Sequence, residues 1–481
     1  MRDDDEDDED DALNLARSLD PVTSKMFVNE LLAKLDTVKG HRRKVENAVL
    51  VVAGNLLYNW QHGESGTTRY SRDHSGITVS SRYNPRGVST RKIESIMDAL
   101  RDNGYIHHKM GFYSKPKKEG KQSRAKPKKP LLDLALKHDL LVDSTLIDKS
   151  SEIIRLKNAE KQLIEYEDDE ITSAMRNDLA DWNNFMEQYD VDLWLSNAEI
   201  KADERLSKTD FAKTQLYRVF NRSSFSEGGR FYGHWLQQVE SKHRILTQLN
   251  QKDTVEVDWS SLHPAMLYAL DGLPIPVEDL YFLPGITLER GVIKEIMLII
   301  LNTESQTGAV AAINKNLKGK LTLSDGSSIK AKTILDALKR KHRYISKHFY
   351  TGVARRLQFL DSEMIRHIMK GFIREHVPMV PIHDSIITWR SCEHIAQKLM
   401  REAVETMLLQ KGIGQLNTIK DDELGWIDRY IGPSLRAVPE HERREMTIGD
   451  PTDLLGEKGD RFFEVSRDIE ARQNRRKKVR S

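Results

Sequence analysis

Two aspartates in similar settings, Asp258 and Asp384, have the residue type and position that most suggest chemistry. Asp258 follows a strand-like run in VEVDWSSLHP, and Asp384 lies where two apolar strands meet in VPMVPIHDSIITW. An aspartate at a strand end is usually a turn residue, so neither is informative alone. If the strands are neighbours, however, the two carboxylates can hold two Mg²⁺ ions about 3.5–4 Å apart, one activating an attacking hydroxyl and one holding a leaving phosphate.

A helix is predicted between the two aspartates, over LERGVIKEIMLIILNTES. Arg290 and Lys294 are four residues apart and share one face of it, and Leu298 and Asn302 continue the same row. Like charges at this spacing repel by roughly 0.2–0.5 kcal/mol. An anion bound between them, such as a triphosphate, reverses that cost. The alternative is an ordinary surface helix with two cations, and the helix alone favours that alternative.

Segments on both sides extend the pattern. SEGGRFYGHWLQQV offers a flexible glycine turn that presents Arg230, followed by Gln237. RRLQFLDSEMIRHIM places Gln358 and Glu363 on a helix that leads into the Asp384 hairpin. Each segment is weak evidence, but their order along the chain is informative.

That order resembles the family-A DNA polymerases and the related bacteriophage-type single-subunit RNA polymerases, over roughly residues 226–415. In family A, Thr-Gly-Arg and Gln-Asn-Ile-Pro precede motif A, and Gly229-Arg230 and Gln237-Gln238-Val239 are similar. DWSSLH follows the motif A pattern Asp-Tyr-Ser-Gln-Ile-Glu. Arg290 and Lys294 match motif B. His383-Asp384-Ser385 matches motif C, which is His-Asp-Glu in the DNA polymerases and His-Asp-Ser in the RNA polymerases.

The resemblance implies an α+β right-hand polymerase, with an antiparallel palm sheet, helical fingers and a helical thumb. It implies two Mg²⁺ ions, with Mn²⁺ as an alternative, held by Asp258 and Asp384. The implied catalytic residues are Asp258, Asp384 and Lys294, of which Lys294 is also a candidate proton donor to the pyrophosphate. The implied nucleotide-binding residues are Arg290, Lys294, His263 and Asn302. The implied primer-template contacts are Arg230, Gln237, Gln358 and His383.

Two departures from the family pattern concern the sugar of the nucleotide. His263 stands where family A has a glutamate that blocks a ribose 2′-hydroxyl, and where family-B polymerases have a tyrosine. Asn302 stands where family A has a tyrosine that helps to select the sugar. The preference between deoxynucleotides and ribonucleotides therefore stays open.

The N-terminal part predicts a winged-helix-like module. A helix over His41 to Trp60 and a second helix capped by Ser89 precede the strand YIHHKMGFY and the basic segment SKPKKEGKQSRAKPKKP. In that fold a helix enters the major groove and the wing contacts phosphates. The alternative is a small helical domain with a flexible basic linker.

Composition favours an intracellular protein with a polyanionic partner. Of the 481 residues, 38% are hydrophobic and 31% charged, and the net charge is +2. No run approaches the roughly 20 apolar residues of a membrane span, and the acidic start is unlike a signal peptide. Cys392 is the only cysteine, which excludes an intramolecular disulfide and a Cys-based zinc site. A reducing, cytoplasmic location without membrane contact is therefore expected.

The pattern along the chain predicts five regions. They are an acidic disordered tail (1–20), the winged-helix-like module (21–130), a helical thumb-like region (131–225), palm and fingers (226–420), and a C-terminal extension (421–481) with a basic tail from Arg472 to Arg480.

The main hypothesis is a template-directed nucleotidyltransferase, most simply a DNA polymerase that extends a primer in replication or repair, or in a mobile element. Its partners would be a DNA primer-template and nucleoside triphosphates. One alternative is RNA synthesis or template-independent nucleotide addition, with RNA as a further partner. An alternative of another class is a non-catalytic DNA-binding replication initiator or regulator with a degenerate palm.

Overall fold

The computed structural model describes most of the chain, and two hydrophobic cores divide that part in two. The described residues are 12–35, 38–63, 65–72, 81–114, 119–141, 145–147, 151–409, 431–435 and 464–474. One core lies between Leu19 and Leu140 and the other between Ile154 and Val404. The fold is mixed α+β. Within the described ranges, no helix is both long and apolar enough to cross a bilayer.

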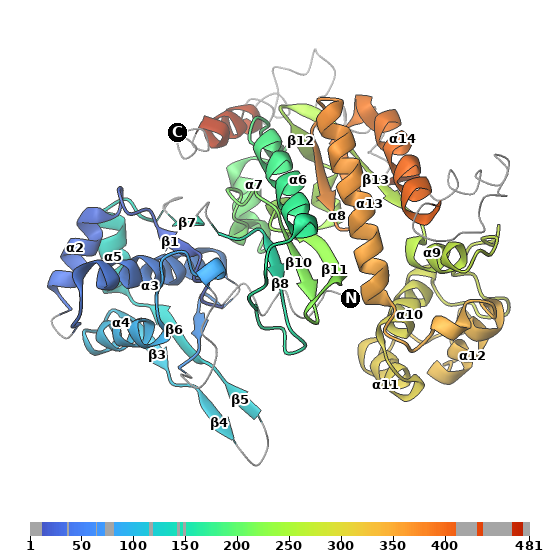
Figure 1. Cartoon of the computed structure of the whole chain (residues 1–481), viewed down its shortest axis with the longest axis horizontal. Coiled ribbons are helices and arrows are strands. Elements are labelled where there is room, and N and C mark those ends of the chain that lie inside the picture. Colours follow the sequence, from blue (N-terminus) through green and yellow to red (C-terminus); the bar gives the residue numbers. More distant parts are fainter. Residues whose placement is uncertain are drawn as a thin grey trace.

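The N-terminal part packs helices beside a small antiparallel sheet of order β2-β6-β3 (Figure 1). Its helices are α2 (Lys25–Ala33), α3 (Arg42–His62), α4 (Thr90–Asp102) and α5 (Lys129–Lys137), with the 3₁₀ turn η1 (Ser81–Tyr83). Its strands are β1 (Arg17–Leu19), β2 (Thr68–Tyr70), β3 (Ile106–Lys109), β4 (Phe112–Ser114), β5 (Glu119–Lys121), β6 (Ser123–Pro127) and β7 (Thr145–Ile147). β4 and β5 form a hairpin that projects from the sheet (Figure 1). The two predicted helices are confirmed, and Ser89 caps α4 by accepting a hydrogen bond from Lys92 N.

The prediction of a disordered tail over residues 1–20 is wrong for residues 12–20, while residues 1–11 lie outside the described residues. β1 pairs antiparallel with β7, and Leu19 is fully buried. Asn55 of α3 accepts a hydrogen bond from Asn14 N at 2.7 Å and donates to Arg17 O at 3.2 Å. The acidic run is followed directly by apolar residues that pack against α3 and are buried, which composition alone does not reveal.

The second part is built on two sheets. A three-stranded sheet contains β8 (Ile154–Leu156), β10 (Tyr217–Asn221) and β11 (Ser224–Tyr232). A larger antiparallel sheet contains β9 (Val191–Leu193), β12 (Thr247–Leu249), β13 (Lys252–Trp259), β14 (Met379–Ile382), β15 (Ser385–Trp389) and β16 (Ile431–Leu435). Its order is β14-β15-β13-β12-β9, and β16 also pairs with β13. The predicted strands on both sides of His383-Asp384 are confirmed as β14 and β15.

Helices cover these sheets and form a lobe beside them (Figure 1). They are α6 (Glu170–Met186), α7 (Asn197–Ala202), α8 (Ser241–Arg244), α9 (Leu262–Leu270), α10 (Arg290–Asn302), α11 (Gln306–Asn316), α12 (Ala331–Lys341), α13 (Ala354–Arg374) and α14 (Glu393–Val404). Short turns are η2 (Leu206–Lys208), η3 (Trp235–Gln238), η4 (Ser346–His348), η5 (Arg390–Cys392) and η6 (Glu405–Leu409). The long helix α13 packs against β11 and α14 and reaches α10, so it joins the sheets to the lobe of α10, α11 and α12 (Figure 1).

The prediction that residues 131–225 form a mainly helical, thumb-like region is wrong. α5 and α6 are its longest helices, and the region also supplies β7, β8, β9 and β10. The charged stretch after Leu156 is not helical, because α6 begins only where Asp169 accepts a hydrogen bond from Thr172 N at 2.7 Å. Charged residues of this stretch make tertiary ion pairs, as described below.

The predicted C-terminal boundary also differs from the structure. β16 lies beyond residue 420 yet adds to the large sheet beside β13. Arg472, predicted to begin a solvated basic tail, belongs to a helix over 464–474 and is buried. Its guanidinium pairs with Asp192 at 3.1 Å, because burial of this cation requires a carboxylate partner.

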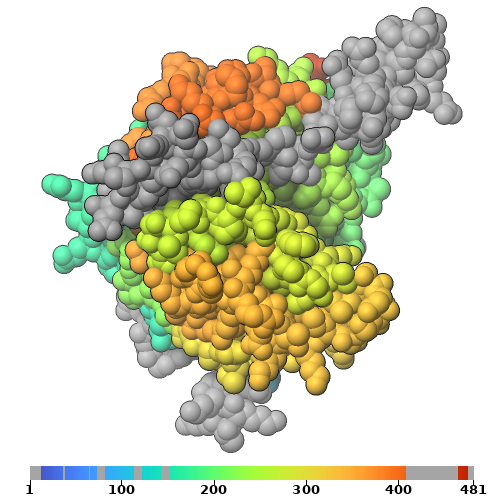
Figure 2. All heavy atoms as spheres, turned by 90° about the vertical axis from the view of Figure 1, so that its right-hand side faces the viewer, coloured from blue at the N-terminus to red at the C-terminus, as the bar shows by residue number. Residues whose placement is uncertain are grey.

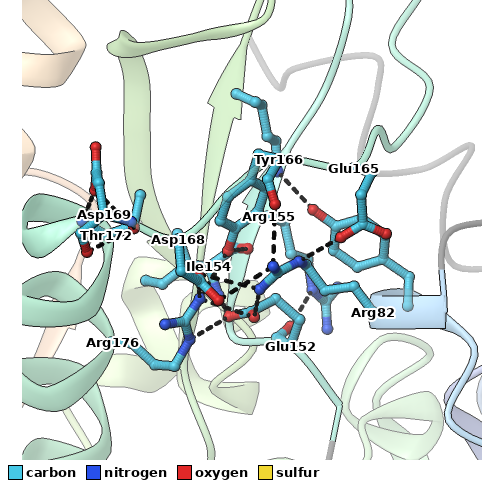
Figure 3. A network of polar contacts seen from close by, with 12 residues as sticks. Arg82, Glu152, Ile154, Arg155, Glu165, Tyr166, Asp168, Asp169, Thr172 and Arg176 are labelled. Atoms are coloured by element: carbon cyan, nitrogen blue, oxygen red, sulfur yellow. Dashed lines mark hydrogen bonds and ion pairs between the residues drawn. The ribbon is translucent and has the colours of Figure 1, made fainter.

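An ion-pair network joins the two parts of the protein (Figure 3). Arg82 of η1 contacts Glu152 at 2.8 Å, Glu165 at 2.8 Å and Asp168 at 3.2 Å. Arg176 of α6 contacts Glu152 at 3.0 Å and Asp168 at 2.6 Å. Because the Arg82 and Glu152 side chains are only 16% and 7% exposed, this network is less screened by solvent than a surface pair.

We expect Arg82→Ala to lower the free energy of unfolding by about 1–2 kcal/mol, since it leaves half-buried carboxylates without one of their cations. It should also speed limited proteolysis between the two parts. Arg42→Ala is the matched control: Arg42 is 78% exposed and makes only surface contacts, an ion pair with Glu46 and a hydrogen bond to Asn29, so its loss should cost less than about 0.5 kcal/mol. Equal effects of the two variants in a denaturant titration would contradict the prediction.

Candidate active site

Asp258 and Asp384 come from neighbouring strands of the large sheet. β13 ends one residue after Asp258, and β15 pairs with it antiparallel. β14 and β15 are joined by a two-residue turn, His383-Asp384. The register brings this turn next to the end of β13. The predicted adjacency of the two strands is therefore confirmed, whereas the metal-binding role of their carboxylates stays a prediction.

Polar contacts lock this register in place. Ser385 donates a hydrogen bond at 2.7 Å to Glu256, which lies on β13 two residues before Asp258. Glu256 also pairs with Arg244 at 2.9 Å and is buried. His383 adopts a left-handed backbone conformation, with φ at 58°, which is unfavourable for a residue other than glycine. The tight turn keeps His383 in this unfavourable conformation and holds Asp384 where β14 ends and β15 begins.

The two carboxylates have opposite pKa shifts. Burial raises the pKa of Asp258 to about 7, and the negative charge of Asp384 adds to this rise, while Lys294 opposes it. Burial by itself raises the pKa of Asp384, but the positive charges of Arg230, His263 and His383 outweigh burial and lower the net pKa below its usual value. A pair of carboxylates driven apart in this way is typical of a functional site.

The residues present fit a divalent cation. Oδ1 of Asp258 is buried and has no hydrogen-bond partner in the described part of the chain. A cation would satisfy that oxygen and remove the repulsion between the two carboxylates. The described residues do not supply a third ligand: no cluster of three or more His, Cys, Asp or Glu side chains among them is arranged to hold a metal. Mg²⁺ suits such a site, since it is commonly held by one or two carboxylates together with water and substrate phosphates.

The start of α10 lies beside this carboxylate pair, as the predicted helix over 290–302 requires. Arg290 donates to the hydroxyls of Ser260 and Ser261, both at 3.3 Å, immediately after β13. It also pairs with Asp279 at 2.8 Å. Lys294 is exposed one turn further along, and its charge lowers the pKa of Asp258. Both predicted phosphate-binding cations therefore lie near the carboxylates.

Asp361 is a buried carboxylate of this cluster that was not predicted from the sequence. It lies on α13 and is fully buried. Oδ2 of Asp361 accepts hydrogen bonds from Arg230 at 2.6 Å and from His263 Nε2 at 2.9 Å. Both of these positive groups act on Asp384. Asp361 therefore fixes the positions of the Arg230 and His263 side chains.

A signal for Asp361 was present in the sequence. It lies on the same face of α13 as the buried residues Leu357, Met364 and Ile368. A carboxylate within an apolar helix stripe must be paired when it is buried. What the sequence does not identify is the partner, because Arg230 is 131 residues away.

The remaining predicted site residues make mostly structural contacts. Gln237 donates to Phe231 O and Pro381 O, both at 3.0 Å, and so ties η3 to β11 and β14. The His383 ring lies 5.9 Å from that of Tyr232. Gln358 is half-buried on α13.

Asn302 ends α10 about 18 Å along the axis from Arg290, and its amide donates to Leu298 O at 2.9 Å. Contacts of these residues with nucleotide or primer-template stay predictions.

No protein-family model matches the chain, and no curated protein matches it. The assignment of the site therefore depends on the residues themselves: two strand-borne carboxylates, two cations at the start of α10, and the buried carboxylate that orients Arg230 and His263.

Proposed function

We propose that the protein is a template-directed nucleotidyltransferase of the family-A polymerase type, with a palm sheet around β13–β15 and fingers formed by α10–α12. The observation that carries the proposal is the pairing of Asp258 and Asp384 beside Arg290 and Lys294. This combination suits a triphosphate and a divalent cation better than it suits a structural ion-pair network. In such a network, Oδ1 of Asp258 would have a partner.

The residues would act mainly by positioning and charge neutralisation. Arg290 and Lys294 would hold the nucleotide phosphates while the primer 3′-hydroxyl attacks the α-phosphate and the bond to pyrophosphate breaks. Lys294 would face the pyrophosphate as it leaves. When bound, Mg²⁺ supplies activation of the hydroxyl and neutralisation of the phosphates. The basic hairpin β4–β5 of the winged-helix-like module would contact phosphates of the nucleic acid.

The direct test is extension of a labelled primer on DNA and RNA templates with deoxynucleotides or ribonucleotides in Mg²⁺. Template-dependent extension supports the proposal, and untemplated addition replaces it with the template-independent alternative. Extension only by ribonucleotides favours RNA synthesis, which the RNA-polymerase-like His383-Asp384-Ser385 supports. Absence of extension, of Mg²⁺-dependent nucleotide binding and of any Asp384 dependence would leave the non-catalytic DNA-binding alternative.

His263→Ala should increase incorporation of ribonucleotides relative to deoxynucleotides by roughly tenfold or more. His263 stands five residues after Asp258, and its ring is buried and held by Asp361. A fixed ring at this position can exclude a 2′-hydroxyl, and a clash of this size is worth about 1–3 kcal/mol in discrimination. Competition between the two nucleotides in single-turnover extension measures the effect. An unchanged ratio would exclude His263 as the determinant of sugar choice.

A further inference from the structure

The lobe formed by α11 and α12 carries an unusual excess of positive charge. Residues 306–349 contain ten Lys or Arg residues and only two Asp residues, with no Glu. These residues, in gold, occupy the lower part of the face shown in Figure 2. The excess is local, because the whole chain has a net charge of only +2. It lies far from the N-terminal basic hairpin in the fold (Figure 1).

Most of these cations are not neutralised within the protein. Six of them are exposed and have no ion-pair partner among the described residues: Lys315, Lys318, Lys330, Lys332, Arg340 and Arg343. We call these six residues the α12 basic surface. Unpaired cations gathered on one lobe repel one another, and a polyanion with regularly spaced charges relieves that repulsion.

Exposed aromatic rings lie among these cations. Tyr344 is 57% exposed, and the guanidinium of Arg343 lies 4.5 Å from its ring centroid and donates to its hydroxyl. Phe282 is also 57% exposed and lies 5.7 Å from Lys341 Nζ. Aromatic and guanidinium planes stack on unpaired bases, whereas the bases of a duplex are inaccessible to them. The combination fits a single strand better than a duplex.

The α12 basic surface is connected to the candidate active site through one loop. Lys341, at the end of α12, donates to the carbonyl oxygens of Asp279 and Phe282. Asp279 is also the carboxylate that pairs with Arg290 at 2.8 Å. The neighbouring His342 bonds to Leu280 O at 2.8 Å. A strand that lies on α12 can therefore continue past this loop toward Arg290.

We propose that the α12 basic surface binds single-stranded nucleic acid, as the path of the unpaired template strand beside the active site. The template assignment rests on the proposed function, whereas binding of a single strand does not. Phosphates would contact the six cations, and bases would stack on Tyr344. Binding should fall steeply with salt, with a log–log slope of about −0.7 per phosphate contact.

The test uses the full chain and a fluorescein-labelled oligo(dT) of about 16 nucleotides, with anisotropy measured over a range of salt concentrations. We expect Lys332→Gln/Arg340→Gln/Arg343→Gln to weaken binding roughly tenfold at moderate salt and to reduce the slope by about 2. The matched control, Lys201→Gln/Arg374→Gln/Lys398→Gln, removes the same charge from exposed positions on α7, the end of α13 and α14. It should weaken binding by less than about twofold.

Tyr344→Ala should weaken oligo(dT) binding about fivefold and leave binding of a blunt duplex unchanged. Wild type should also prefer a primer-template with a 5′ overhang to a blunt one, and the triple variant should lose that preference. Equal binding by the triple variant and its control would overturn the inference, as would equal losses on single strand and duplex.

These outcomes are separate from those of the proposed function, because binding is measured without nucleotide or Mg²⁺. A protein that extends primers but shows no effect of the triple variant would retain the proposed function and lose the surface. A protein that shows the effect but never extends a primer would retain the surface as a single-strand contact and lose the polymerase assignment.

Discussion

Replacing Asp384 with alanine should reduce primer extension at least about a thousandfold while the protein remains folded. Asp384 lies in the half-buried two-residue turn between β14 and β15 and takes no part in their pairing, so its removal leaves the strand register of β14 and β15 intact. It also removes one of two carboxylates that repel each other at Asp258. A metal held by these carboxylates would stabilise the transition state by several kcal/mol. Because about 1.4 kcal/mol of barrier corresponds to a tenfold change in rate, its loss accounts for the expected thousandfold effect.

The measurement is single-turnover extension beside oligonucleotide binding and thermal melting of the same preparations. Asp258→Asn should give a similar loss, since an amide does not replace a carboxylate as a Mg²⁺ ligand. Asp325→Ala, a change at an exposed loop carboxylate, is the control and should extend normally. Near-normal extension by Asp384→Ala would refute the assignment of both aspartates to a metal site.

Without divalent metal, the stability of the protein should fall as pH rises from about 4 to about 7, because of Asp258. In the unfolded chain this carboxyl ionises near its ordinary pKa of 3.8, whereas in the fold its pKa is about 7. Between these values the folded state holds the proton and the unfolded state does not. The stabilisation is therefore complete below the unfolded pKa and is lost as pH rises through the folded pKa. The effect is on the order of a few kcal/mol.

The difference between wild type and Asp258→Asn isolates this effect from other titrations. We expect the variant to melt higher than wild type at pH 8 in EDTA, by roughly 5–10 °C, and to lack the decline between pH 4 and 7. Mg²⁺ should raise the melting temperature of wild type at pH 8 more than at pH 5, because it binds the ionised carboxylates. It should leave the variant unchanged. Parallel pH profiles of the two proteins would show that Asp258 is not the perturbed group.

The local elements around the site were predictable because their signals lie within short segments. Two apolar runs and a turn sequence indicate β14 and β15 on both sides of His383-Asp384. Apolar periodicity indicates α10 and the shared face of Arg290 and Lys294. The order of these segments along the chain led to the resemblance, and the pairing of β13 with β15 confirms only that the two strands are neighbours.

The predictions that the structure contradicts are those based on charge composition alone, without a periodic pattern of apolar residues. Residues 12–20 were included in the acidic tail although Leu19 is core, and Arg472 was placed in a solvated tail although it pairs with Asp192. The charged segment before Asp169 was predicted to be helical although its carboxylates bind Arg82, more than 80 residues away. In each case the partner is distant in sequence, so charge alone gave the wrong exposure.

The sequence by itself determined which residue types are available and which strand, turn or helix presents them, because propensity, periodicity and capping act over a few neighbouring residues. Only the tertiary structure decided what those residues do to one another. Asp258 and Asp384 are the same side chain with opposite pKa shifts, since burial and Asp384 act on one, while Arg230 and His263, oriented by Asp361, act on the other. Electrostatic interactions of this kind depend on distance and burial in three dimensions, which segments more than a hundred residues apart define only when the chain folds.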